Sequence, residues 1–229
     1  TSTSGGSVSG LHVTSFNNVT IINNTFGALK SIGGIGTYGS TVFGISVHGY
    51  GYQLIVKNNI IGNSTPENIF ATDSIAQDGN YSMGIDASYI RTSLLITNNI
   101  IRNIVSYKKG NNSNSGVYGI NTGEGSDAYP QFSNIIDSNT IYNLSTYSRM
   151  AIGIQYYPGI GSVSYNTISN VACLDTGFRD SRSAGIYLYR PISPLVRGNR
   201  IYNIKNCYCD ILVLALALCL TLPLITSIR

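Results

Sequence analysis

Side chains that could do acid–base chemistry are few in this chain. Of its 229 residues, two are histidines and ten are acidic. Asp86 directly follows the dipeptide Gly84-Ile85, and His48 lies three residues after Ile45 of the similar dipeptide Gly44-Ile45. If the two side chains were neighbours, the imidazole could act as a general base that the carboxylate orients. They could equally form an ordinary cross-strand pair on an exposed surface, so the outcome depends on the elements that carry them.

Tyrosines form the second group of interest, because the chain has 17 of them and no tryptophan. Several stand near polar amides in the second half of the sequence: Asn121, Gln155, Tyr157, Tyr187 and Tyr189. A tyrosine has a flat apolar face and a polar tip, which suits stacking on a sugar ring. The alternative is that these tyrosines only fill a pleated surface, because tyrosine is a good strand former.

The sequence offers little for other kinds of site. Two cysteines occur as Cys207-Tyr208-Cys209, but zinc motifs space their cysteines more widely and need further ligands. We therefore expect no metal and no cofactor, and the confinement of all four cysteines to the last third excludes a disulfide scaffold. The net charge of +4 comes from scattered basic residues, apart from Lys108-Lys109, so we expect no nucleic-acid partner.

The elements that position these residues are predicted to be strands and turns. Only 10% of the residues are charged, and the polar positions hold Asn, Ser, Thr and Gly rather than the residues that cover soluble helices. A short block of Gly, a branched residue, a polar residue and often an apolar one recurs at intervals of roughly 35 residues, a period typical of solenoids. Its copies begin at Gly10, Gly44, Gly84, Gly119, Gly153 and Gly185.

A second block follows each glycine block and has the form of an apolar run, Asn, an apolar pair and often another Asn. The central asparagines are Asn59, Asn99, Asn139, Asn166 and Asn199, with a degenerate copy at Asn24. We predict that they form one corner column with buried or half-buried amides, since asparagine tolerates the left-handed conformation and stacked amides can bond to each other.

Three strands per repeat would stack into a solenoid. Alternation along a strand places the residue after each glycine inside and the next one outside. The predicted outer column is His12, Ser46, Asp86, Asn121, Gln155 and Tyr187. His48 then lies diagonally across from Asp86, one strand spacing away.

These two blocks resemble the repeats of the pectin-lyase-like right-handed parallel β-helix proteins, in particular bacterial secreted or surface proteins. The resemblance covers about residues 10–206 and implies an all-β, right-handed parallel β-helix of about six coils, located outside the cell or on its surface. Enzymes of this family that cut pectin-type polymers use clustered acids, which hold calcium or serve as acid and base, with a basic residue nearby. Here the candidates are His48, Asp86 and Arg91, but adjacent Asp pairs, Asn-x-Asp and Gly-His-Gly are absent, and Val47-His48-Gly49 is the nearest approach.

Two functions follow from the resemblance. The first is a non-catalytic module that binds polysaccharide or acts as an adhesive scaffold, with ligand contacts at Asp86, Asn121, Gln155, Tyr157, Tyr187 and Tyr189. Variable segments 62–81, 104–117 and 171–184 would flank this strip, and the low net charge favours neutral or weakly acidic sugars. The second is a polysaccharide lyase or glycoside hydrolase, which would bring in calcium.

The last segment, residues 207–229, departs from the repeat. Ile211 to Ile228 is an uncharged run close to the length of a membrane span, interrupted by Pro223. It can be interpreted as a membrane anchor, as a poor continuation of the solenoid or as the product of a slipped reading frame. Because the chain starts within an apparent repeat and without Met, we interpret residues 1–206 as the β-helix fragment of a longer parent chain.

Overall fold

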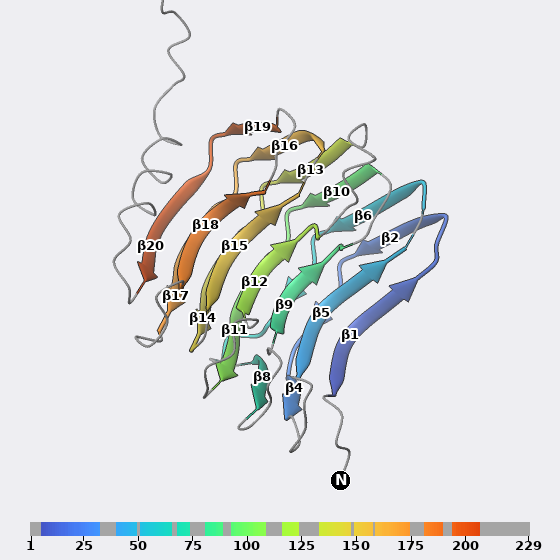
Figure 1. Cartoon of the computed structure of the whole chain (residues 1–229). Helices are drawn as coiled ribbons and strands as arrows, with labels where there is room; N and C mark the ends of the chain where they lie inside the picture. Colours follow the sequence, from blue (N-terminus) through green and yellow to red (C-terminus); the bar gives the residue numbers. More distant parts are fainter. Residues whose placement is uncertain are drawn as a thin grey trace, which may run out of the picture.

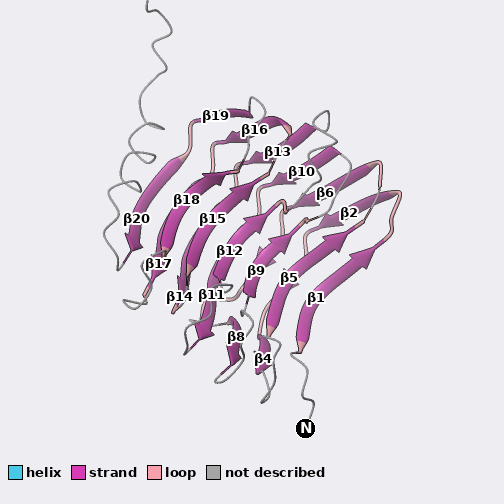
Figure 2. Cartoon of the chain, in the orientation of Figure 1, coloured by secondary structure: helices cyan, strands magenta, loops and turns pink. Residues whose placement is uncertain are grey.

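The structure is a computed structural model, and it describes residues 6–32, 40–49, 51–65, 68–73, 81–88, 93–108, 116–123, 133–147, 149–157, 159–174, 181–189 and 194–206. These residues form strands and turns and contain no helix, as Figure 2 shows. The expectation of an all-β fold is thereby confirmed. No helix of the described residues is long and apolar enough to cross a membrane, and the segment 207–229 lies outside them.

The strands are arranged in three parallel sheets (Figure 1). Sheet 1 consists of the glycine-block strands β1 (Ser7–Thr14), β5 (Thr41–His48), β9 (Tyr81–Asp86), β12 (Gly116–Asn121), β15 (Met150–Tyr156) and β18 (Arg182–Leu188). Sheet 2 consists of the strands before the asparagine corner: β2 (Asn18–Ile22), β6 (Gln53–Lys57), β10 (Ser93–Thr97), β13 (Ser133–Asp137), β16 (Ile160–Ser164) and β19 (Pro194–Arg197).

Sheet 3 consists of the strands after that corner: β3 (Thr25–Phe26), β7 (Ile60–Ile61), β11 (Ile100–Lys108), β14 (Thr140–Thr146), β17 (Thr167–Cys173) and β20 (Arg200–Asn206), with β4 (Leu29–Ile32) and β8 (Ile69–Asp73) extending it. Each strand pairs in parallel with the equivalent strand of the next repeat, so the chain visits the three sheets in turn. The predicted three strands per repeat and the solenoid of stacked parallel strands agree with this register.

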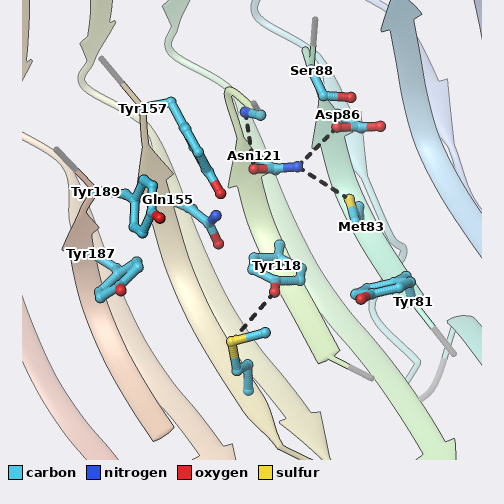
Figure 3. Close-up of a pocket in the computed structure, with 12 residues that line it drawn as sticks. Tyr81, Met83, Asp86, Ser88, Tyr118, Asn121, Gln155, Tyr157, Tyr187 and Tyr189 are labelled. Atoms are coloured by element: carbon cyan, nitrogen blue, oxygen red, sulfur yellow. Dashed lines mark hydrogen bonds between the residues drawn. The ribbon is translucent and has the colours of Figure 1, made fainter. Parts of the chain in front are cut away.

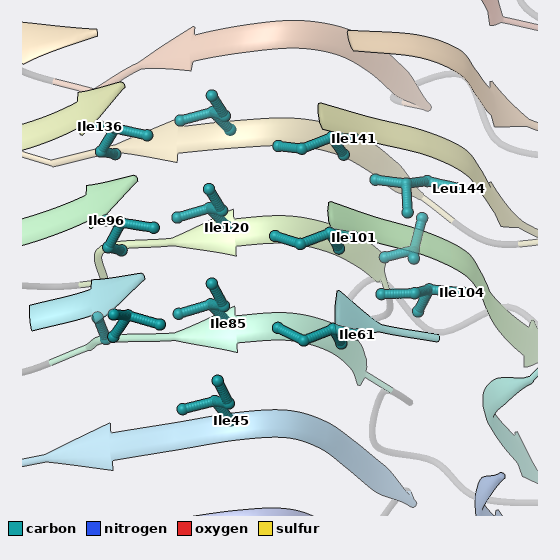
Figure 4. Close-up of a cluster of buried hydrophobic side chains, with 14 of the residues drawn as sticks. Ile45, Ile61, Ile85, Ile96, Ile101, Ile104, Ile120, Ile136, Ile141 and Leu144 are labelled. Carbon is teal, nitrogen blue, oxygen red and sulfur yellow. The ribbon is translucent and has the colours of Figure 1, made fainter. Parts of the chain in front are cut away.

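The core is built from columns of branched apolar side chains. In sheet 1, Ile45 pairs with Ile85, and Ile85 pairs with Ile120; all three are fully buried, as predicted. Equivalent columns from sheets 2 and 3 face them across the interior (Figure 4). Since every repeat buries its apolar face against the next, neighbouring repeats supply one another's core.

The recurring glycine is required by a close approach between repeats. A Cβ atom on Gly119 would lie 2.5 Å from the carbonyl oxygen of Gly153 and 2.7 Å from Cγ2 of the core residue Ile141. Gly84 is equally crowded, by the Gly119 carbonyl oxygen at 2.6 Å and by Ile101 Cγ2 at 2.5 Å. The glycine column therefore lets sheet 1 come close to sheet 3, and a larger residue would force the two apart.

The asparagines between sheets 2 and 3 form a hydrogen-bonded column. In Asn99, the backbone N–H and the side-chain Nδ2 both donate to Oδ1 of Asn139, at 3.0 Å each. Asn59 donates to Asn99 in the same way, Asn139 to Asn166, and Asn166 to Asn199. The amides of Asn59, Asn99, Asn139 and Asn166 are buried and Asn199 is half-buried, whereas Asn24, at the end of the column, is exposed.

Of the two reasons given above for asparagine at this corner, the bonding between stacked amides is confirmed and the left-handed conformation is wrong. The left-handed residue is the one before each column asparagine, and it is Asn58, Asn98, Ser138, Tyr165 or Gly198. The column position needs asparagine because its side chain must both donate and accept within a buried corner. A second set of asparagines does take the left-handed conformation, at the bend inside the strands of sheet 3: Asn103, Asn143, Asn170 and Asn203.

Candidate functional site

The outer face of sheet 1 carries an open hollow of about 330 Å³ (Figure 3). We call it the tyrosine hollow and define it by Tyr81, Met83, Asp86, Ser88, Tyr118, Asn121, Gly123, Met150, Gln155, Tyr157, Tyr187 and Tyr189. These residues belong to or directly follow β9, β12, β15 and β18, so the hollow extends across four neighbouring strands. All six residues of the predicted ligand-binding strip line it: Asp86, Asn121, Gln155, Tyr157, Tyr187 and Tyr189.

The outer column of sheet 1 is less exposed than predicted. Asp86 lines the hollow but is only 3% exposed, and Ser46 is fully buried. The strands stack closely, so a short side chain is covered by the longer side chains beside it; Ser46, for example, lies between His12 and Asp86 in register. The interpretation of this column as a freely exposed strip was therefore wrong for Ser46, Asp86 and Gln155, which are buried.

His48 and Asp86 are in direct contact, as the diagonal arrangement implies. Asp86 Oδ2 lies 2.8 Å from His48 Nε2, and Ser88 Oγ lies 3.0 Å from the same nitrogen. In a serine-nucleophile triad, the acid and the serine contact opposite nitrogens of the imidazole. Here both contacts converge on Nε2, so this group is not arranged as a nucleophile, a base and an orienting acid.

Both carboxylate oxygens of Asp86 have partners. Asn121 Nδ2 donates to Oδ1 at 3.1 Å, while Oδ2 faces His48. The hydrogen bond to Asp86 raises the pKa of His48 above its usual value of 6.5, although partial burial opposes the shift. Both oxygens of Asp86 are thus engaged by protein groups, and one of these contacts ties the carboxylate to Asn121 in the hollow.

The third catalytic candidate, Arg91, lies outside the described residues. Among the described residues that line the hollow, Asp86 is the single acid. No group of three or more His, Cys, Asp or Glu side chains suited to a metal ion occurs in the described part of the chain.

The other end of the hollow is aromatic. The ring centres of Tyr157 and Tyr189 are 5.0 Å apart and those of Tyr187 and Tyr189 are 6.4 Å apart, each pair tilted by 41°. Tyr189 is 37% exposed, and Tyr157 and Tyr187 are half-buried. The backbone N–H of Tyr157 donates to Thr122 Oγ1 at 3.0 Å, which fixes the backbone of Tyr157 against the neighbouring strand. The three rings form a tilted wall whose edges and faces border the hollow (Figure 3).

The floor between the two ends carries Gln155 and Tyr118. Gln155 is 9% exposed, and its Oε1 atom is buried without a hydrogen-bond partner among the described residues. Tyr118 is buried beside it, its hydroxyl donates weakly to Met150 Sδ at 3.7 Å, and burial raises the pKa of this phenol far above the usual value. The floor is therefore mostly apolar, with one polar atom that none of the described residues satisfies.

Besides Ser88 and Gly123, four large residues of the hollow are missing from the predicted strip: Tyr81, Met83, Tyr118 and Met150. Strict alternation would place Tyr118 on the same side as Ile120, which is inside. In the structure Gly119 interrupts the alternation, so Tyr118 packs in an outer cluster with Met83 and Ile152 while Ile120 stays in the core. The large residue before most of the glycines is the signal that could have revealed this outer cluster.

No protein-family model, curated protein or solved structure matches the chain. Function is therefore inferred from the geometry of the hollow.

Proposed function

We propose that this chain is a non-catalytic module that binds polysaccharide in the tyrosine hollow, as part of a protein that works outside the cell or on its surface. The observation that carries the proposal is the combination of three tilted tyrosine rings with amide side chains in one open hollow. Aromatic faces cover the apolar faces of sugar rings, and amides bond to sugar hydroxyls. Such a site orients a sugar without needing a charged group.

We further propose that the scaffold is a right-handed parallel β-helix of six coils, related to the pectin-lyase-like proteins. Sheet 1 contains six strands, one from each repeat, which supports six coils. Connections between parallel strands of one sheet are right-handed in about 98% of cases, which supports the handedness. A long polymer could then lie along the solenoid axis and cross several coils.

The rival proposal is a polysaccharide lyase or glycoside hydrolase, and the contact between His48 and Asp86 favours it. Two observations weigh against it. Glycoside hydrolysis generally needs a pair of carboxyl groups, and Asp86 is the single acid among the described residues of the hollow. Both oxygens of Asp86 are also occupied by His48 and Asn121. Calcium would enter only with the lyase alternative.

Retention on immobilised polysaccharides tests the proposal. The wild-type chain should be retained by at least one member of a panel of neutral and acidic polysaccharides, because the hollow offers stacking surfaces to sugars in general. The double variant Tyr157→Ala/Tyr187→Ala should lose retention, while its β-rich circular dichroism is unchanged. The matched control is Tyr52→Ala/Tyr202→Ala, which removes two exposed tyrosines that lie outside the hollow.

A product assay separates the two proposals. The chain is incubated with the same polysaccharides, with and without calcium, and reducing ends and unsaturated products are measured. A binding module yields neither product. If the wild-type chain forms product and His48→Gln does not, the chain is an enzyme and the binding proposal is overturned.

A further inference from the structure

The Oε1 atom of Gln155 differs in its hydrogen bonding from the other polar side chains of its column. Ser46, Asp86, Asn121 and Gln155 occupy successive positions of one column on the outer face of sheet 1. The first three are hydrogen-bonded: Ser46 Oγ contacts His12 Nδ1 at 3.2 Å, and Asp86 and Asn121 bond to each other. Gln155 is nine-tenths buried, yet its Oε1 has no partner among the described residues.

An unpaired buried acceptor weakens a folded protein unless something else satisfies it. The column itself shows that the fold can pair a polar side chain at this depth, because Asp86 and Asn121 are paired. Gln155 lies between the paired groups and the aromatic wall, in register with Tyr187 on the next strand. Figure 3 shows its amide inside the hollow, among Tyr157, Tyr187 and Tyr189.

From this arrangement we infer that Gln155 is the specificity-determining residue of the hollow, where its amide binds a hydroxyl of an uncharged hexose polymer and disfavours a uronate at the same position. The inference rests on the proposed function and narrows its ligand from polysaccharides in general to neutral ones. A carbonyl oxygen accepts hydrogen bonds and cannot donate. Its partner must therefore carry a hydrogen, as a sugar hydroxyl does and an ionised carboxylate does not.

The charges around Gln155 also favour a neutral sugar over a uronate. None of the described residues that line the hollow is a lysine or an arginine, and its one acid, Asp86, lies two strands away, at about 10 Å. The imidazole of His48 is already engaged by Asp86, and Arg149, whose charge acts on Tyr118, lies six residues before Gln155 in the chain. A carboxylate beside Gln155 would therefore lose water without gaining an opposite charge, which is costly. If the amide is rotated by 180°, its NH2 group can donate to a hydroxyl or to a carboxylate, and the missing opposite charge is then what disfavours the uronate.

The experiment compares matched pairs of sugars. Hexasaccharides of glucan, mannan and galactan are each used beside a C6-oxidised form, in which carboxylates replace the CH2OH groups, and binding is measured by calorimetry. For the neutral sugar that binds best, we expect the wild-type chain to bind the oxidised form at least tenfold more weakly. Gln155→Met, which keeps the length of the side chain and removes the amide, should weaken binding of the neutral form by about tenfold.

The unfolding midpoint distinguishes this role from a structural one. Gln155→Met should leave the midpoint unchanged or raise it, since it removes an unpaired buried acceptor, whereas a structural amide would lower it on removal. The matched control is Gln53→Met, on the exposed outer face of β6, which should change neither binding nor midpoint.

The outcomes distinguish the failure of the role of Gln155 from the failure of polysaccharide binding itself. If the wild-type chain binds no member of the panel, the proposed function itself fails. If it binds sugars but Gln155→Met binds equally well, or if the oxidised form binds more tightly, polysaccharide binding stands and the role of Gln155 is overturned. A midpoint that drops in Gln155→Met also overturns it.

Discussion

Replacing one asparagine in the middle of the corner column should destabilise the chain far more than replacing the one at its end. Asn99 is fully buried, and its Oδ1 accepts from the backbone N–H of Asn59 at 2.9 Å. Its Nδ2 donates to the backbone carbonyl of Val56, also at 2.9 Å. Asn99→Leu removes the acceptor of the Asn59 N–H and the donor to the Val56 carbonyl oxygen, while Asn59 and Val56 both stay buried.

The magnitude follows from those two groups. A buried polar group left without a partner costs about 1–3 kcal/mol, and the added apolar surface of leucine returns only part of this. We therefore expect Asn99→Leu to lower the free energy of unfolding by about 2–4 kcal/mol. Asn24→Leu is the matched control, because Asn24 is exposed and donates to Asn59 without accepting from another column member. Its cost should stay below about 0.5 kcal/mol, as for most surface changes.

Urea unfolding followed by circular dichroism measures both variants against the wild-type chain. The comparison requires similar slopes of the free energy with urea, because a changed slope would mean that the variants unfold in a different way. Equal midpoints for Asn99→Leu and Asn24→Leu would refute the reasoning, since the column would then contribute nothing beyond the packing of its strands.

Three further predictions concern sheet 1 and the hollow. Gly119→Ala should lower the free energy of unfolding by about 1–3 kcal/mol, because its Cβ would meet a backbone carbonyl at 2.5 Å; a wild-type urea midpoint would contradict the close approach. The pair of His48 with Asp86 should stabilise the fold fully below pH 6.5 and lose this effect as the pH rises through the raised pKa of His48, so the unfolding midpoint should fall over that window. His48→Gln should flatten this pH dependence, and an unchanged profile would disprove the coupling. Tyr157→Ala/Tyr187→Ala should abolish retention on polysaccharide while the β-rich circular dichroism is unchanged, and retention that persists would move the binding site elsewhere.

The repeat, the apolar core column and the asparagine column could be predicted from the sequence, because each depends on the same residue type recurring in every repeat. A solenoid needs the same residue types at the same place in every repeat, so Ile45, Ile85 and Ile120 reveal the core position by recurrence alone. Asn59 and Asn99 reveal the corner in the same way, since a buried amide column needs the same side chain in successive repeats. The pairing of His48 with Asp86 followed from this register and the alternation of strands.

What the tertiary structure alone decided is how the outer face of sheet 1 is packed. Gly119 interrupts the expected alternation, because Gly119 and Ile120 both face the interior, and Tyr118 therefore lies in the floor of the hollow. Whether Gln155 finds a partner depends on the neighbours that three-dimensional packing brings beside it, and no pattern along the chain encodes that. Recurrence along the sequence identifies a shared scaffold, whereas a binding site arises where repeats differ, so its shape becomes known only once the strands are stacked.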